Sequence, residues 1–72
     1  MISYAPRLEQ NFEYDLKRVR RLIKEDQYSD LKKLINSWPM ALYHLKIMGR
    51  LKLYERYVYL KYCPDEIREL FN

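Results

Sequence analysis

The chain has 72 residues, of which 49% are hydrophobic and 33% are charged, and its formal net charge is +4. A chain of this length forms a single domain, residues 1–72, that buries only about 60% of the surface exposed on unfolding. With one cysteine, Cys63, and one histidine, His44, the sequence excludes an internal disulfide and a zinc site built from cysteine and histidine ligands.

The first predicted helix extends from Pro6 to about Glu25, after residues 1–5, which have no periodic pattern and are expected to form a loose tail. Its apolar residues recur at steps of four and three, as on one face of a helix: Leu8, Phe12, Leu16, Val19 and Ile23. Pro6 suits the first turn, where its missing N–H removes no hydrogen bond. Acidic residues precede basic residues along this segment, which complements the helix dipole.

A polar break at residues 26–29 precedes a short second helix, for which Ser29 is the expected N-cap. Its apolar residues follow the spacing i, i+3, i+4 and i+7: Leu31, Leu34, Ile35 and Trp38. Pro39 disfavours helical geometry at the residue before it, so this helix is expected to end there.

The third and longest predicted helix extends from Pro39, in its first turn, to Tyr62. One stripe at alternating steps of four and three consists of Met40, His44, Ile47, Leu51, Tyr54, Val58 and Tyr62. A second set on roughly the opposite side consists of Leu42, Leu45, Gly49, Leu53 and Leu60. A helix with apolar residues on two sides needs two packing partners. The sequence therefore predicts an all-α bundle of about four helices, packed around this long central third helix.

An α+β fold is the alternative, because Gly49 and Arg50 suit a two-residue hairpin turn between two strands. In that register both faces of the hairpin have mixed polarity, for example with Lys46 opposite Leu53. Periodicity therefore favours the helix. Glycine inside a helix costs about 1 kcal/mol relative to alanine, and a close helix crossing at Gly49 would account for its presence.

Pro64, followed by Asp65 and Glu66, predicts one more short helix, because proline and acidic residues favour a first helical turn. The apolar residues of this helix fall on one face: Ile67, Leu70 and Phe71. This helix completes the predicted bundle.

Positive charge is concentrated in the middle of the chain. Residues 1–16 and residues 62–72 each contain one arginine and three acidic residues, so each end carries −2 and the total of +4 leaves +8 between them. Five of these cations lie between Lys17 and Lys24. Such a concentration indicates an anionic partner, either nucleic acid or an acidic protein surface.

The eight tyrosines are the most unusual feature of the composition. Tyr54 and Tyr62 belong to the long stripe and are expected in the core. Tyr57 and Tyr59 lie off the stripe, and we expect both to contact a partner, because tyrosine is enriched at protein interfaces. Stacking on single-stranded bases is the alternative.

The sequence contains no arrangement typical of catalysis or cofactor binding. His44 lies between apolar residues of the stripe, which favours a packed, neutral histidine. Cys63 has no base nearby, although a nucleophilic cysteine requires one, and a single glycine cannot form a glycine-rich phosphate loop. We expect a protein that is not an enzyme and that binds no cofactor and no metal.

Two short stretches resemble known families. The segment YERYVYLKYCPDEIRELF, from Tyr54 to Phe71, resembles the first part of the helix-turn-helix of sigma-factor region 4, which implies a DNA-binding regulator. The segments FEYDLKRV and PDEIREL are similar to the small ribosome-dependent ribonuclease toxins of toxin–antitoxin pairs, whose fold contains a multi-stranded sheet. We assign no family from stretches of this length.

These features predict a small basic binding protein that acts by protein–protein interaction, as an inhibitor, regulator or assembly subunit of a larger complex with an acidic surface. Self-association is also expected, and a nucleic-acid-binding regulator or accessory factor is the alternative. The predicted interface consists of Lys17, Arg18, Arg20, Arg21, Lys24, Lys32, Lys33, Arg50, Arg56, Tyr57 and Tyr59. No membrane span or signal peptide is expected, and one unpaired thiol is typical of the cytoplasm.

Overall fold

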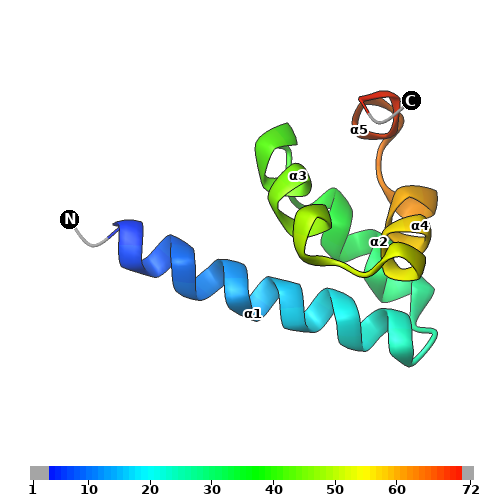
Figure 1. Cartoon of the computed structure of the whole chain (residues 1–72), viewed down its shortest axis with the longest axis horizontal. Helices are drawn as coiled ribbons and strands as arrows, with labels where there is room; N and C mark the ends of the chain where they lie inside the picture. Colours follow the sequence, from blue (N-terminus) through cyan, green and yellow to red (C-terminus); the bar gives the residue numbers. More distant parts are fainter. Residues whose placement is uncertain (1–3, 71–72) are drawn as a thin grey trace.

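The structure, a computed structural model, describes the backbone of residues 4–70 and the side chains of residues 12–70. Its helices are α1 (Tyr4–Lys24), α2 (Tyr28–Asn36), α3 (Ala41–Arg50), α4 (Leu53–Tyr62) and α5 (Asp65–Glu69). Figure 1 shows α2, α3 and α4 gathered along the C-terminal half of α1, with the first turns of α1 extending beyond them. The all-α prediction is confirmed: every regular element of residues 4–70 is a helix, and the alternative hairpin is not supported.

The length of α1 follows from the apolar face that the sequence predicts. The described residues of that face are buried: Phe12, Leu16, Val19 and Ile23. The helix begins at Tyr4 rather than at Pro6, so Pro6 still lies in the first turn, and it ends at Lys24, close to the predicted end. Of the expected N-terminal tail, residues 1–3 lie outside the described residues, whereas residues 4 and 5 are helical.

The turn between α1 and α2 is closed by backbone hydrogen bonds. The N–H of Asp26 donates to the carbonyl oxygen of Ile23 at 3.2 Å, and the N–H of Gln27 donates to that of Leu22 at 2.9 Å, which is the Schellman pattern. Asp26 has the positive φ, 57°, that this pattern requires. Aspartate enters this region of backbone space more readily than most residues, because its short side chain can hydrogen-bond locally.

α2 begins at Tyr28, with Gln27 at the N-cap position instead of the predicted Ser29. The predicted stripe packs against the core, with Leu31 and Ile35 buried and Leu34 and Trp38 partly buried. α3 begins at Ala41, so Pro39 precedes this helix instead of opening it.

The predicted long third helix is two helices, which is the main correction to the expected fold. α3 ends before Leu51 and Lys52, which are extended, with ψ angles of 152° and 164°. Beyond them α4 turns back, so His44 of α3 and Tyr59 of α4 are hydrogen-bonded at 2.7 Å. In one continuous helix these two residues would lie about 22 Å apart along the axis.

Glu55 gives a physical reason for this break. Its carboxylate accepts a hydrogen bond from the backbone N–H of Lys52 at 2.8 Å and so caps the first turn of α4. The same buried side chain lies 3.3 Å from the guanidinium of Arg20 in α1. These contacts, together with the burial of Leu51, stabilise a helix start that periodicity does not indicate. The predicted close crossing is absent from the described residues, because no neighbouring atom lies within 4 Å of a Cβ placed on Gly49.

The two extended residues also change which face of α4 is buried. Tyr54, expected in the core, is 59% exposed, whereas Tyr59, expected to contact a partner, is completely buried. The predicted buried positions of this segment are wrong, because the prediction continued the helical periodicity of α3 across Leu51 and Lys52. Tyr62 does pack partly buried against the core, where its ring stacks on that of Tyr28 with centroids 5.3 Å apart.

His44 is buried, as expected, and both of its ring nitrogens have partners. Nε2 lies 2.6 Å from the carbonyl oxygen of Trp38, which can only accept, so Nε2 carries the proton. Nδ1 lies 2.7 Å from the Tyr59 hydroxyl, which can either donate or accept a hydrogen bond. Nearby, the Tyr43 hydroxyl donates to the carboxylate of Asp15 in α1. The buried imidazole of His44 thus links α3 to α4 inside the core.

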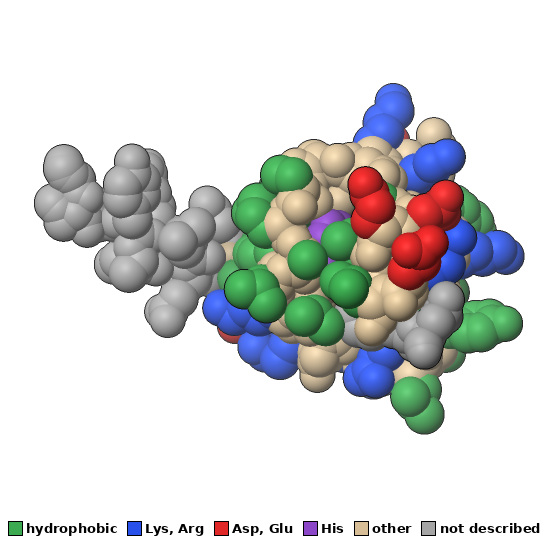
Figure 2. Space-filling model, turned by 90° about the horizontal axis from the view of Figure 1, so that it is seen from above, with side chains coloured by type: hydrophobic (Ala, Val, Ile, Leu, Met, Phe, Trp, Pro, Cys, Tyr) green, Lys and Arg blue, Asp and Glu red, His purple; other side chains and the backbone are tan. Residues whose placement is uncertain are grey.

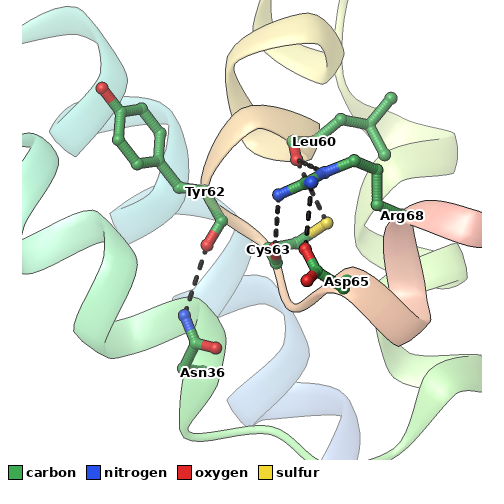
Figure 3. A network of polar contacts seen from close by, with 6 residues as sticks. All are labelled: Asn36, Leu60, Tyr62, Cys63, Asp65 and Arg68. Carbon is green, nitrogen blue, oxygen red and sulfur yellow. Dashed lines mark hydrogen bonds and ion pairs between the residues drawn. The ribbon is translucent and has the colours of Figure 1, made fainter.

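The end of α4 is capped by side chains of other helices, as Figure 3 shows. Asn36 of α2 donates from its amide to the carbonyl oxygen of Tyr62 at 3.2 Å. Arg68 of α5 donates to the carbonyl oxygens of Leu60, at 3.1 Å, and of Cys63, at 3.2 Å. The last carbonyls of a helix have no partner within it. Side chains of α2 and α5 therefore help to fix where α4 ends.

α5 is short and lies at one end of the molecule (Figure 1). Ile67 is buried, but Leu70 is 58% exposed, and Phe71, expected on the same face, lies outside the described residues. Figure 2 shows the acidic side chains of α5 beside apolar side chains over α3. The exposed apolar residues on and just before α3 are Met40, Leu42 and Leu45.

Candidate interaction surface

The outer face of the C-terminal half of α1 is basic. Lys17, Arg21 and Lys24 follow the spacing i, i+4 and i+7 on the side away from the buried stripe, and all three are exposed. At 1.5 Å per residue they span about 10 Å along the helix. These three residues are called the α1 ridge below.

An open hollow of about 580 Å³ lies on one side of the ridge, between α1 and α2. Its charged lining consists of Arg18, Arg21, Lys33, Glu25 and Asp30. Leu22 and Leu34 also line it. Because three cations lie beside two carboxylates, this hollow has mixed charge with a small positive excess.

A second hollow, of about 650 Å³, lies on the other side, between α1 and the start of α4. Its lining consists of Arg20, Arg21, Lys24, Glu25, Lys52, Tyr54 and Glu55. Tyr54 thus places an exposed aromatic ring among cations. Arg21 and Glu25 line both hollows, so the ridge and the two hollows form one continuous surface.

The structure brings together part of the predicted interface. The predicted residues that lie on this surface are Lys17, Arg18, Arg20, Arg21, Lys24 and Lys33. Lys32 is exposed on α2 but lines neither hollow. Arg50 lies elsewhere, 3.4 Å from Glu13 and with its guanidinium 5.6 Å from the centre of the Phe12 ring. Arg56 is half-buried, and its Nε has no hydrogen-bond partner among the described residues.

The two predicted tyrosines differ in their accessibility. Tyr57 is 78% exposed and lines a separate hollow with Leu60, Lys61 and Arg68. Tyr59 is completely buried and bonded to His44, so it is not accessible to a partner in this fold. Only Tyr57 therefore remains a candidate for contact.

Lys52 and Tyr54 belong to the surface, although neither was among the predicted residues. The sequence does contain a signal for them, because an acidic residue three positions after an N-cap is typical of a helix start. Glu55 stands in that relation to Lys52. A helix that starts there turns Tyr54 toward the end of α1 instead of into the core.

The chemistry that this surface offers is electrostatic: its cations attract negatively charged groups, and the carboxylates in its hollows attract positively charged ones. Among residues 12–70, no group of three or more histidine, cysteine, aspartate or glutamate side chains is placed to hold a metal. Cys63 is buried, and burial raises the pKa of its thiol, which disfavours the reactive thiolate. No helix in the described part of the chain is long and apolar enough to cross a membrane.

The chain matches no protein-family model, no curated protein and no solved structure. The short resemblances to sigma-factor region 4 and to ribonuclease toxins gain no support from these comparisons.

Proposed function

We propose that this protein is a small, non-enzymatic binding protein that holds an acidic surface of a larger protein. The α1 ridge and its two flanking hollows form the binding surface. In this role the protein acts as an inhibitor, a regulator or an assembly subunit of a larger complex.

The mixed charge of the hollows is the observation that carries this proposal. Glu25 lines both hollows and Asp30 lines one, each beside cations such as Arg21. A nucleic-acid backbone presents only negative charge, so it is repelled by these carboxylates. A protein partner can place a cation opposite each of them, and such alternation of sign specifies one partner and one register.

The second hollow supports the same partner class. Tyrosine and arginine are the residue types that contribute most to binding energy at protein interfaces, and Tyr54 lies beside Arg20 and Arg21 there. Arg20 is already held by Glu55 at 3.3 Å. Its side chain therefore loses less conformational freedom on binding than a free arginine does.

One observation favours the alternative, a nucleic-acid-binding regulator. No acidic residue lies between Lys17 and Lys24, so the ridge itself presents an unbroken line of positive charge. Binding of labelled duplex and single-stranded oligonucleotides at several salt concentrations distinguishes the two. For duplex DNA, the alternative predicts that the logarithm of the association constant falls linearly with the logarithm of the salt concentration. The slope is about −0.9 for each phosphate that the protein neutralises. A tight complex with that dependence would overturn the protein-partner proposal.

Affinity capture with charge-reversal variants tests the proposal directly. Arg21→Glu changes the residue shared by both hollows, whereas the control Lys32→Glu makes the same charge change outside them. We expect wild type and the control to retain a partner that Arg21→Glu loses. With that partner purified, we expect Arg21→Glu to weaken binding by at least about tenfold and the control by less than about twofold. Identical partner sets for all three proteins contradict the proposal.

A further inference from the structure

The two hollows that flank the α1 ridge differ in their net charge. The second hollow, between α1 and the start of α4, is lined by four cations and two carboxylates, which leaves +2. The first hollow, between α1 and α2, is lined by three cations and two carboxylates, which leaves +1. Cations that are not neutralised repel one another, so a group with about two negative charges matches the second hollow.

One carboxylate of the second hollow is already used inside the fold. Glu55 is 5% exposed, lies 3.3 Å from Nε of Arg20 and accepts a hydrogen bond from the backbone N–H of Lys52. The Nη groups of Arg20 have no hydrogen-bond partner among residues 12–70, and the side chain of Arg20 is 39% exposed. Arg20 therefore offers the hollow two donor groups on a guanidinium that Glu55 holds in place.

The other charged groups of the second hollow are accessible. Arg21, Lys24 and Lys52 are exposed, and none of them forms an ion pair within residues 12–70. Glu25 is exposed as well, and it is unpaired in the same part of the chain. These accessible groups are three cations and one carboxylate, so they also leave +2. Two of the cations belong to α1 and the third precedes α4.

We propose that the second hollow binds a phosphorylated side chain of the partner protein. This inference rests on the proposed function, because the phosphoryl group belongs to that partner. A phosphate monoester carries about −1.5 to −2 at pH 7, whereas a single carboxylate leaves the hollow positive. Arg21 can bind two phosphate oxygens at once, and Lys24 and Lys52 add point charges.

A nucleic-acid backbone matches this hollow less well. Each of its phosphodiesters carries one negative charge, so a single one does not neutralise the hollow. Several phosphates in a row also meet Glu25, which repels them. The excess charge is therefore best matched by one dianion, which a phosphate monoester supplies.

Titration of the isotope-labelled protein with phenyl phosphate and phenyl sulfate, followed by two-dimensional NMR, tests this match of charge. The two ions have the same shape, but near pH 7.5 phenyl phosphate carries about two negative charges and phenyl sulfate carries one. We expect both ions to shift the amide signals of Arg21, Lys52 and Tyr54, and phenyl phosphate to bind at least about threefold more tightly. Equal affinities, or shifts confined to other residues, overturn the proposal.

The second charge of the phosphate also predicts a pH dependence. Phenyl phosphate loses that charge near pH 6, so its advantage over phenyl sulfate should disappear at about pH 5. Phenyl sulfate remains a monoanion over this range, so it reports any change in the protein itself. An advantage that persists at the lower pH contradicts the proposal.

Lys52→Gln tests whether the second hollow is the site. Lys52 lines this hollow and not the first, and its loss should weaken the binding of phenyl phosphate by at least about threefold. The matched control Lys32→Gln makes the same charge change outside both hollows and should alter the affinity by less than about 1.5-fold. Equal losses indicate general attraction to a basic protein and overturn the proposal.

Phosphatase treatment of the partner distinguishes failure of this inference from failure of the proposed function. We expect dephosphorylation to weaken the wild-type complex by at least about tenfold. A partner that still binds through Arg21, and equally tightly after dephosphorylation, overturns the phosphoryl inference and leaves the proposed function intact.

Discussion

The joint between α1 and α2 and the joint between α3 and α4 are both short, but they are held in different ways. Backbone hydrogen bonds within residues 21–27 close the first joint. The second is held by side chains that are distant in sequence, with Arg20 bound to Glu55 and His44 bound to Tyr59. The first turn is therefore specified locally, whereas the second requires the assembled core. Substitutions at the second joint should reduce the free energy of unfolding most.

His44→Ala should have the largest effect. It removes a completely buried side chain and leaves the Tyr59 hydroxyl and the Trp38 carbonyl oxygen without their partner. We expect a loss of about 3–4 kcal/mol in the free energy of unfolding, measured by urea denaturation. The control Tyr57→Ala changes a residue that is 78% exposed and should cost less than about 0.5 kcal/mol. Comparable losses for the two variants would show that the contacts of His44 contribute little to the free energy of unfolding.

Alkali should weaken the second joint. Burial raises the pKa of Tyr59 and Tyr43 above the usual 10.0, and the hydrogen bond to Asp15 adds to the effect at Tyr43. As the pH rises above 10.0, the tyrosines of the unfolded chain lose protons that the folded chain keeps, so the free energy of unfolding falls. For Tyr59 the limiting slope is about 1.4 kcal/mol per pH unit.

Urea denaturation between about pH 9 and pH 12, the range in which ordinary tyrosines titrate, measures this slope. Tyr43→Phe should make it shallower, because the proton that Tyr43 retains in the folded chain is removed. Tyr14→Phe is the control, since Tyr14 is 60% exposed, and it should leave the slope unchanged. A slope that is the same in all three proteins contradicts the prediction.

Glu55→Gln should have a moderate effect. The glutamine oxygen can still cap α4, but the ion pair with Arg20 is lost, and the side chain of Glu55 is only 6% exposed. We expect a cost of about 1–2 kcal/mol, because Arg20 is partly solvated and its charge is not stranded in the core. Glu13→Gln removes a comparable pair with Arg50 in which the side chains are 54% and 53% exposed, and it should cost less than about 0.5 kcal/mol. Equal costs would mean that burial does not strengthen the Arg20 pair.

Gly49→Ala should have the smallest effect, and in the opposite direction. A Cβ at this position meets open space, so alanine should stabilise α3 by about 0.5–1 kcal/mol at protein concentrations that keep the chain monomeric. The helical signal in circular dichroism should stay the same if the distant contacts, and not the glycine, produce the break. A clear gain in helical signal would indicate that α3 and α4 had fused.

The difference between local contacts and contacts distant in sequence also explains which parts of the fold could be predicted from the sequence. The buried face of α1 is set by residue spacing within one helix, and four of its residues were predicted: Phe12, Leu16, Val19 and Ile23. Leu22 is also buried but was not predicted, and the side chain of Leu8, which was predicted, lies outside the described residues. The ends of α3 and α4 depend on Arg20 meeting Glu55, which periodicity does not reveal, so the phase of Tyr54 and Tyr59 was wrong. The basic residues of α1 were found because they share one helix. Lys52 and Tyr54 come close to these basic residues only when the chain is folded.

Cys63 gives the molecule an internal reporter of opening. Cys63 is 4% exposed, its thiol donates to the carbonyl oxygen of Leu60 at 3.3 Å, and the residue lies at the junction of α4 with α5. A thiol-specific reagent can modify it only when that junction separates. The rate of labelling in the unmodified protein therefore measures how often this end of the chain unfolds locally, and a reagent in excess gives the opening rate itself.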